Sequence, residues 1–153
     1  MGCKKMDAVT YPNEAVTDFV RKHIVPVRIR YDQQPLAGQY RVKWTPTLIA
    51  VDKDGNEIYR NEGFLPPEDL IPALMLGIGK VRLNEGNYQE AISHLSELSS
   101  KYPKSEEAPE AVYFLGVARF KSTNDFKVLK QTFDQLSKEY PSSIWTKKAS
   151  PYR

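Results

Sequence analysis

The sequence has 153 residues, of which 41% are hydrophobic and 27% charged, and its formal net charge is +3. These values are ordinary for one globular domain or two small ones, and the charge is too small to indicate binding to nucleic acid or to a membrane surface. No apolar run approaches the roughly 18 residues that a membrane span requires. The single cysteine, Cys3, excludes an internal disulfide framework, so the composition favours a reducing cytoplasm or a catalytic thiol.

The N-terminal part of the chain is predicted to form two helices. The stretch from Tyr11 to Glu14 separates them, and Asn13 is suited to cap the second helix because its side chain can accept a hydrogen bond from a free backbone N–H. One apolar face of the second helix is formed by Val16, Phe19, Val20 and His23. We expect this face to pack on a sheet.

A strand, a short helix and a two-stranded hairpin are predicted next. The strand is indicated by alternating apolar residues, namely Val25, Val27, Ile29 and Tyr31. The short helix is expected over residues 35–40. A proline cannot donate to a ladder, so Pro46 must lie at the mouth of a strand over residues 47–51. A tight Asp-Gly turn then leads to a partner strand over residues 57–59, and a helix opens at Pro66.

These stretches together resemble the later two-thirds of a thioredoxin domain. The resemblance is carried, in the family's order, by residues 25–32, residues 40–42, residues 45–48, residues 54–57 and residues 63–66. It implies that Pro46 follows a cis peptide bond and faces the redox cysteines, and that the backbone of Thr45 pairs with an extended substrate. Trp44 is then either an aromatic anchor in the substrate groove or a core residue.

The N-terminus resembles the second half of the thioredoxin Cys-Xaa-Xaa-Cys motif, in which the second cysteine lies in the first turn of a helix. The resemblance implies that Cys3 is the resolving cysteine and that the attacking cysteine falls one position before Met1. Cys3 alone cannot run a dithiol cycle. Cys3 is therefore either the vestige of a redox site or a thiol without a role.

The family's first strand, helix and strand have no counterpart in the sequence. We expect that the sequence is a fragment or has a misassigned start codon. The alternative is a true variant, in which another element or another chain fills the gap. In the variant, an open sheet edge favours strand exchange or a homodimer.

The second half of the chain repeats itself, since residues 94–105 match residues 132–143 at a constant offset. This pattern resembles tetratricopeptide repeats, in which pairs of helices stack. Each unit has a small residue, Gly79 or Gly116, where its second helix can approach closely. The second helices offer apolar residues at helical spacing, namely Ala91, Leu95 and Leu98, or Leu129, Phe133 and Leu136. A final helix over residues 143–149 is expected to cap the stack together with the thioredoxin-like part.

No catalytic or metal-binding motif is found elsewhere, so neither a cofactor nor a metal is expected. We expect His23 and His94 to lie far apart, without metal-ligand neighbours. The carboxylates at the start of one repeat helix favour its dipole, and they are Glu106, Glu107 and Glu110. The aromatic residues of the same helix are either core or part of a concave peptide-binding face, and they are Tyr113, Phe114 and Phe120.

The predicted fold class is therefore α/β, with an incomplete thioredoxin-like sheet over residues 1–73 and an all-α tetratricopeptide-like array over residues 74–153. Two functions remain open. The first is a bacterial thiol-disulfide oxidoreductase, in which Cys3 resolves and residues 44–46 hold a cysteine-containing protein or peptide, impaired here as a dithiol enzyme. The second is a non-catalytic adaptor or co-chaperone-like protein. In both, protein partners bind the repeats. The compartment is the cytoplasm as the sequence stands, or the periplasm if an upstream signal peptide has been lost.

Overall fold

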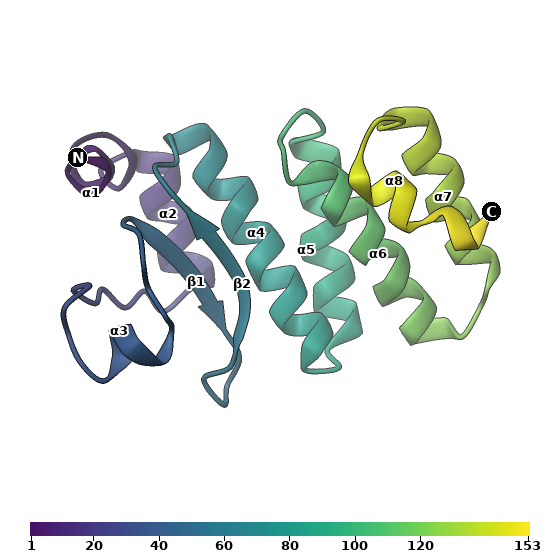
Figure 1. Cartoon of the computed structure of the whole chain (residues 1–153). Helices are drawn as coiled ribbons and strands as arrows, with labels where there is room; N and C mark the ends of the chain where they lie inside the picture. The colour runs from purple at the N-terminus through teal and green to yellow at the C-terminus, as the bar shows by residue number, and fades with distance from the viewer.

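The computed structural model describes residues 1–153, with an α/β part at the N-terminal end and a row of helices at the C-terminal end (Figure 1). In chain order the elements are α1 (Gly2–Lys5), the π-helix η1 (Met6–Thr10), α2 (Glu14–His23), α3 (Leu36–Gln39), β1 (Thr47–Val51), β2 (Glu57–Glu62), α4 (Pro67–Asn84), α5 (Tyr88–Lys101), α6 (Ala108–Thr123), α7 (Lys127–Glu139), α8 (Ile144–Lys148) and the 3-10 helix η2 (Ser150–Tyr152). The predicted fold class, an incomplete thioredoxin-like sheet followed by helical repeats, is confirmed.

The sheet has two antiparallel strands. Thr47 pairs with Glu62 at one end and Val51 with Glu57 at the other, with a register shift between Ala50 and Val51. Pro46 lies directly before β1, as predicted from its missing N–H. The partner strand runs further than predicted, because β2 continues to Glu62.

The strand predicted over residues 25–31 is absent. The chain from Val25 to Arg30 is irregular, and none of its backbone N–H groups donates to a carbonyl. Val25 and Val27 are 89% and 76% exposed. The alternation of apolar residues indicated an extended chain, but a strand also needs a neighbour to pair with, and none lies beside this segment.

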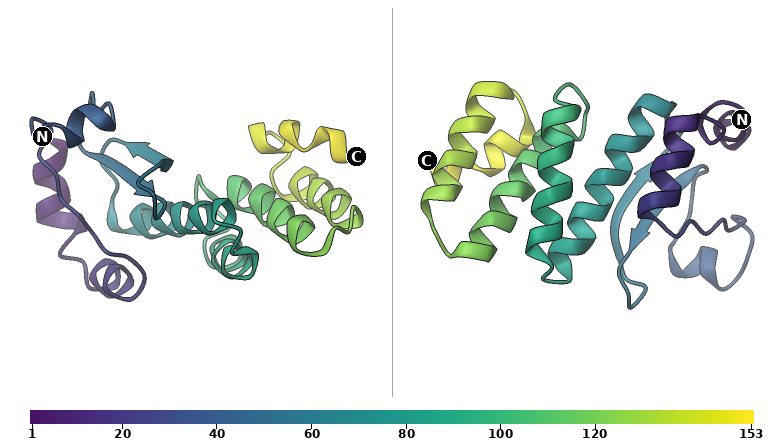
Figure 2. Two further views of the ribbon diagram at one scale, coloured as in Figure 1. Left: turned by 90° about the horizontal axis from the view of Figure 1, so that it is seen from below. Right: turned by 180° about the vertical axis from the view of Figure 1, so that it is seen from behind.

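Helix α4 covers the sheet at Gly77. A Cβ atom on Gly77 would lie 3.1 Å from Cδ1 of Tyr59 and 3.2 Å from Cβ of Ala50, so the absence of a side chain permits the close approach of helix and sheet. Helix α2 lies beside α4 (Figure 2), and Val16 is buried against it. The apolar face of α2 therefore packs chiefly on α4, which corrects the expectation that it packs on the sheet.

One hydrophobic core runs through both parts of the chain. Its fifteen buried residues extend from Met6 and Val16 at the N-terminal end to Ala118 on α6. Helix α4 contributes to both parts, because it contacts the sheet and also α5. The helix continues without a break through Gly77 and Gly79. The boundary after residue 73 stays a prediction, and it falls inside this helix.

The repeat part consists of the hairpins α4–α5 and α6–α7, followed by α8 (Figure 2). A Cβ on Gly79 would lie 2.6 Å from Cγ of Leu95, and a Cβ on Gly116 would collide with Thr132. Both glycines therefore permit the predicted close helix contact. The Tyr140 hydroxyl donates to the carbonyl of Pro103 at 2.8 Å, which joins the ends of the two hairpins.

The hairpin turn depends on the carboxylate of Asp52. Its oxygens accept hydrogen bonds from the backbone N–H groups of Asp54 and Asn56 at 2.9 Å and from Nδ2 of Asn56 at 3.0 Å. The Asn56 side chain contributes most to lowering the pKa of Asp52. We expect the turn to be weakened by acid, because the folded chain then binds fewer protons than the unfolded chain.

We predict that stability is lost as pH falls below about 5 toward the lowered pKa of Asp52. In Asp52→Asn this loss should be smaller, since the group no longer titrates. Urea unfolding over a pH series measures it. Asp54→Asn is the control, because that exposed carboxylate accepts no hydrogen bond. Equal acid sensitivity of the wild type and Asp52→Asn would contradict the assignment.

Candidate functional site

Helix α1 begins directly beside Pro46. A Cβ atom on Gly2 would lie 2.6 Å from Cδ of Pro46 and 3.6 Å from the carbonyl oxygen of Thr45. The Thr45–Pro46 peptide bond is cis. Cys3 follows Gly2 in the first turn of α1, and its thiol is free and half-buried. The structure thus brings the turn that carries Cys3 together with Thr45 and Pro46, which are more than forty residues away in the sequence.

A hollow of about 350 Å³ lies next to this contact. It is lined by Met1, Tyr31, Val42, Lys43, Trp44 and Thr45. Trp44 is 67% exposed, so it is not a core residue, and the anchor alternative remains. The loop that carries Trp44 is held at its end, because Oγ1 of Thr47 donates to the carbonyl of Trp44 at 2.7 Å.

The segment after Cys3 is fixed to the loop that follows the hairpin. Oγ1 of Thr10, which is buried, donates to the carbonyl of Leu65 at 2.6 Å. The N–H of Leu65 donates to Sδ of Met6 at 3.4 Å. These bonds restrain η1, and η1 continues directly from α1. The position of Cys3 is therefore restrained from both directions along the chain, by Gly2 against Pro46 and by Met6 and Thr10 against Leu65.

An ion pair joins η1 to the segment that follows α2. Arg28 forms a two-pronged ion pair with Asp7, at 2.8 Å and 2.9 Å. This hydrogen bonding is the main reason that the pKa of Arg28 is raised and that of Asp7 lowered. Burial raises the pKa of Tyr11, against a smaller opposing effect of the Arg28 charge. These three residues carry no functional signal in the sequence, because no local pattern relates Arg28 to Asp7.

Two family comparisons agree with this geometry. The family model described as "Thioredoxin-like domain" matches residues 1–77, which is just over half of the chain. The chain belongs to the thioredoxin-like family. A second model, described as "Tetratricopeptide repeat", matches residues 73–105, which cover most of α4 and α5. A search of curated proteins found no match.

The two family matches overlap within α4, so the thioredoxin-like domain and the first repeat share one helix. On one side of that helix, Nζ of Lys80 lies 2.8 Å from Oε1 of Glu110. The same ammonium group lies 5.0 Å from the ring centre of Phe114 and 5.6 Å from that of Tyr59. Lys80 therefore links β2 of the thioredoxin-like domain to α6 of the repeats.

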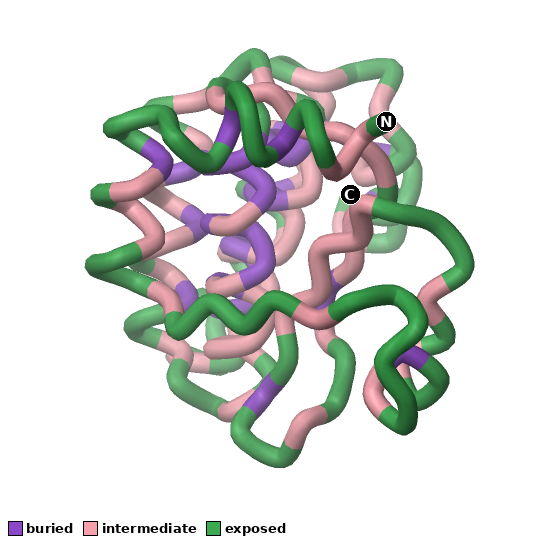
Figure 3. Tube along the Cα trace, turned by 90° about the vertical axis from the view of Figure 1, so that its left-hand side faces the viewer, coloured by how far each residue is buried: buried purple, intermediate pink, exposed green.

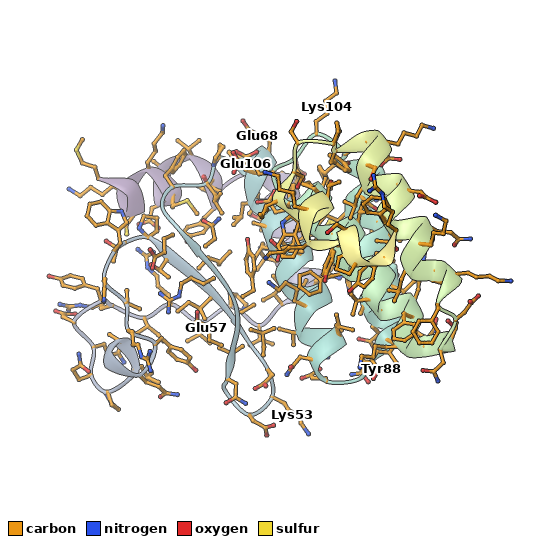
Figure 4. The ribbon with its side chains drawn as sticks, turned by 45° about the vertical axis from the view of Figure 1, so that its right-hand side comes forward. Lys53, Glu57, Glu68, Tyr88, Lys104 and Glu106 are labelled. Atoms are coloured by element: carbon orange, nitrogen blue, oxygen red, sulfur yellow. The ribbon has the colours of Figure 1, made fainter.

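Acidic side chains gather where α4 and α6 begin, and Figure 4 shows Glu68 and Glu106 near each other there. Burial raises the pKa of Asp69, and the charges of Glu68 and Glu106 raise it further. Burial likewise raises the pKa of Glu107. Their place at helix N-termini favours the helix dipole, as expected from the sequence. No group of three His, Cys, Asp or Glu side chains is arranged to hold a metal ion, and no helix is long and apolar enough to cross a membrane.

The two histidines meet at the junction between the thioredoxin-like domain and the repeats. The ring centres of His23, on α2, and His94, on α5, are 5.6 Å apart, with the rings edge to face. This corrects the expectation that they lie far apart. The ring of Phe19 lies 4.6 Å from that of His23. Beside them a hollow of about 240 Å³ separates α2 from α5.

We predict that acid weakens this junction. Burial lowers the pKa of His94, and the neighbouring His23 lowers it further, against a smaller opposing effect of Glu97. The unfolded chain then binds more protons between the lowered value and the ordinary one, so the free energy of unfolding falls as pH drops from about 6.5. His94→Gln should flatten this part of the profile, measured by urea unfolding. If the free energy of unfolding of His94→Gln fell with pH as steeply as that of the wild type, the histidine pair would be excluded as the cause of the acid sensitivity.

Proposed function

We propose that this thioredoxin-like chain binds an extended, cysteine-containing segment of a client protein across Thr45 and Pro46 and exchanges disulfides with it through Cys3. The observation that carries the proposal is the contact between Gly2 and Pro46, because it puts the first turn of α1 at the groove. Trp44 is exposed beside the hollow and is suited to hold an apolar client side chain.

The exchange proceeds by attack of the Cys3 thiolate on one sulfur of a client disulfide. A bond forms between Sγ of Cys3 and that sulfur, and the client's own disulfide bond breaks. The electron pair leaves with the second client sulfur, which takes a proton from water. The client disulfide is thereby reduced while Cys3 is oxidised to a mixed disulfide. Since the sequence has one cysteine, release of the mixed disulfide requires an external thiol.

The repeats are proposed to bind a second part of the client. Support comes from the face where Tyr59, Lys80 and Phe114 meet, which joins the thioredoxin-like domain to α6. Further aromatic rings continue the same side of α6, with Tyr113 and Trp145 at 5.2 Å between ring centres. Aromatic residues are enriched at the surfaces by which proteins bind one another.

The proposal is tested with a peptide whose cysteine carries a thionitrobenzoate group. The wild type should release thionitrobenzoate and gain the mass of the peptide, and Cys3→Ser should do neither. Trp44→Ala should slow the reaction with the peptide by about tenfold, the effect of losing one aromatic anchor. Its reaction with the small free reagent should be unchanged. Equal rates for wild type and Trp44→Ala with the peptide would exclude the groove as the binding site.

The second candidate is a non-catalytic adaptor, and the observation that favours it is the single cysteine. In that case the thioredoxin-like domain serves as a scaffold for the partner-binding face. The same peptide experiment separates the two functions. Peptide binding without a mixed disulfide supports the adaptor, whereas a mixed disulfide at Cys3 supports exchange.

A further inference from the structure

Two charged side chains are buried in this chain, Asp52 and Glu107, and each is 9% exposed. Figure 3 shows the usual arrangement, in which buried stretches lie in the interior among the helices and the outer chain is exposed. The carboxylate of Asp52 accepts hydrogen bonds from Asp54, Asn56 and Asn84. The carboxylate of Glu107 accepts no hydrogen bond from another element and forms no ion pair.

Neither capping nor the helix dipole explains why a carboxylate is buried at this position. Glu107 is the N-cap residue of α6, but its side chain makes no capping hydrogen bond. The Ser105 hydroxyl lies close enough to favour the charged form of Glu107, yet its buried Oγ forms no hydrogen bond. A helix dipole favours a carboxylate near a helix start, but it offsets only part of the cost of burying an unpaired charge.

The neighbouring carboxylates make the surroundings of Glu107 more acidic. Burial raises the pKa of Glu107, and the charges of Asp69 and Glu106 raise it further, against an opposing effect of its own N–H. Glu68 lies near Glu106 where α4 and α6 begin (Figure 4). None of these residues forms an ion pair in the structure. Since the chain as a whole has a net charge of +3, this negative potential is local.

Three elements meet at this position. Helix α4 packs against α6, with Asp69 in the first turn of α4, and the charge of Glu107 also acts on Tyr59 of β2, where it adds to the effect of burial in raising the pKa. One turn further along α6, Glu110 has a cation, because Nζ of Lys80 lies 2.8 Å from its Oε1. Glu107 occupies a corresponding place at the junction without a cation.

We propose that the acidic site formed by Asp69, Glu106, Glu107 and Ser105 binds a lysine or arginine side chain of the client polypeptide. The ammonium or guanidinium group donates to the carboxylate of Glu107 and to Oγ of Ser105, as Lys80 donates to Glu110. Hydrogen bonds of this charged kind are strong where water is excluded. The side chains are not arranged to hold a metal ion, so an organic cation is the occupant.

This inference rests on the proposed function in one respect, which is that the repeats bind a second part of the client. It adds the chemistry of that part, a basic residue that reaches the junction between β2, α4 and α6. The site lies apart from Cys3 and Pro46, so it can be tested without any disulfide.

The variant Glu107→Gln separates a binding residue from a structural one. At pH 7 its urea midpoint should be higher than that of the wild type, because a raised pKa means that the charged carboxylate destabilises the folded chain. This advantage should shrink as pH falls toward about 4, where Glu107 takes up its proton. Binding of a basic peptide should weaken by about thirtyfold, a usual loss when one partner of a buried charge pair is removed. A merely structural residue would not give higher stability together with weaker binding.

The probe is a blocked peptide of alternating Ser and Arg, titrated into the whole chain, with a peptide of alternating Ser and citrulline as the neutral control. Backbone amide shifts are followed by NMR. With the Arg peptide, the amides of residues 68–70 and 105–110 should shift and saturate, and with the citrulline peptide they should not. Glu14→Gln is the matched control, because it removes an exposed carboxylate from the first turn of α2 and should bind as the wild type does.

Equal binding of the Arg peptide by Glu107→Gln and the wild type would overturn the proposal, as would equal shifts with the citrulline peptide. The same shifts with calcium chloride alone would also overturn it, because they would assign the carboxylates to a metal ion. If the Arg peptide does not bind while the thionitrobenzoate peptide still modifies Cys3, this inference fails and the proposed exchange stands. Binding of the Arg peptide without modification of Cys3 would leave this site in place and favour the adaptor.

Discussion

Replacing Leu95 by alanine is expected to lower the free energy of unfolding by about 2–5 kcal/mol, the usual range for a fully buried leucine. Leu95 is 0% exposed and lies on α5, where that helix meets α4. It belongs to the core that runs through both parts of the chain, so its loss should destabilise the thioredoxin-like domain and the repeats together. Urea unfolding followed by circular dichroism and by tryptophan fluorescence measures both parts.

Leu95 packs directly against Gly79, because a Cβ atom on Gly79 would lie 2.6 Å from Cγ of Leu95. Gly79→Ala alone should destabilise by up to about 2 kcal/mol, since the overpacking cost exceeds the gain in helix propensity. In the Leu95→Ala background the same change should stabilise by about 1 kcal/mol, because the new methyl group enters the cavity and the propensity gain remains.

Gly79→Ala is thus expected to destabilise the wild type and to stabilise Leu95→Ala. This change of sign is the result that tests the close approach of α4 and α5. A stabilising effect of Gly79→Ala in both backgrounds would show that the two helices do not approach as closely as the structure has them. Ile144→Ala is the matched control, because Ile144 is 57% exposed and its truncation should change stability by less than about 0.5 kcal/mol.

Features with a local physical cause could be predicted from the sequence. The missing N–H of Pro46 placed β1, and Asn13 caps α2 as expected, with its Oδ1 accepting from the N–H of Val16 at 3.2 Å. The final helix predicted over residues 143–149 is found as α8, with the Ser143 side chain as its cap. The glycine at the middle of each first repeat helix predicted the close contacts that the structure shows, because only a residue without a side chain permits them.

Features that depend on distant partners could not be predicted. Alternating residues indicated that the chain is extended around Val27, but whether it pairs depends on a neighbouring strand, which no local pattern encodes. The meeting of His23 with His94 requires two elements from different halves to pack together. The exposure of Trp44 depends on which way its loop turns, so the sequence left both alternatives open.

The candidate site likewise has some residues that could be predicted from the sequence and others that could not. The resemblance to the thioredoxin family pointed to Cys3, Thr45 and Pro46, and the structure places Gly2, the residue before Cys3, against Thr45 and Pro46. The ion pair of Arg28 and Asp7 had no signal in the sequence, since the two residues are 21 positions apart. Their roles in exchange stay predictions that the peptide experiment tests.

The contact at the site predicts that Gly2→Val slows the proposed exchange with the peptide by about a hundredfold, the effect of a misplacement of about 1 Å at a reacting group. The first added atom would lie 2.6 Å from the Pro46 ring, which is rigid and cannot turn aside. Helix α1 must therefore shift, and Cys3 shifts with it. Leu65 accepts a hydrogen bond from the Thr10 hydroxyl and donates one to Sδ of Met6, and these bonds hold η1, so the rest of the fold should remain.

Two readouts distinguish a displaced thiol from an unfolded protein. The reaction of Gly2→Val with the small free reagent should stay within about threefold of the wild type, because that reagent needs the thiol to be accessible and does not need the groove. Gly38→Ala is the matched control. Its new methyl group meets only the flexible end of the Gln34 side chain, so peptide exchange should be unchanged. If Gly2→Val reacted with the peptide at the wild-type rate, the position of Cys3 beside Pro46 would have no part in the exchange, and the adaptor function would be favoured.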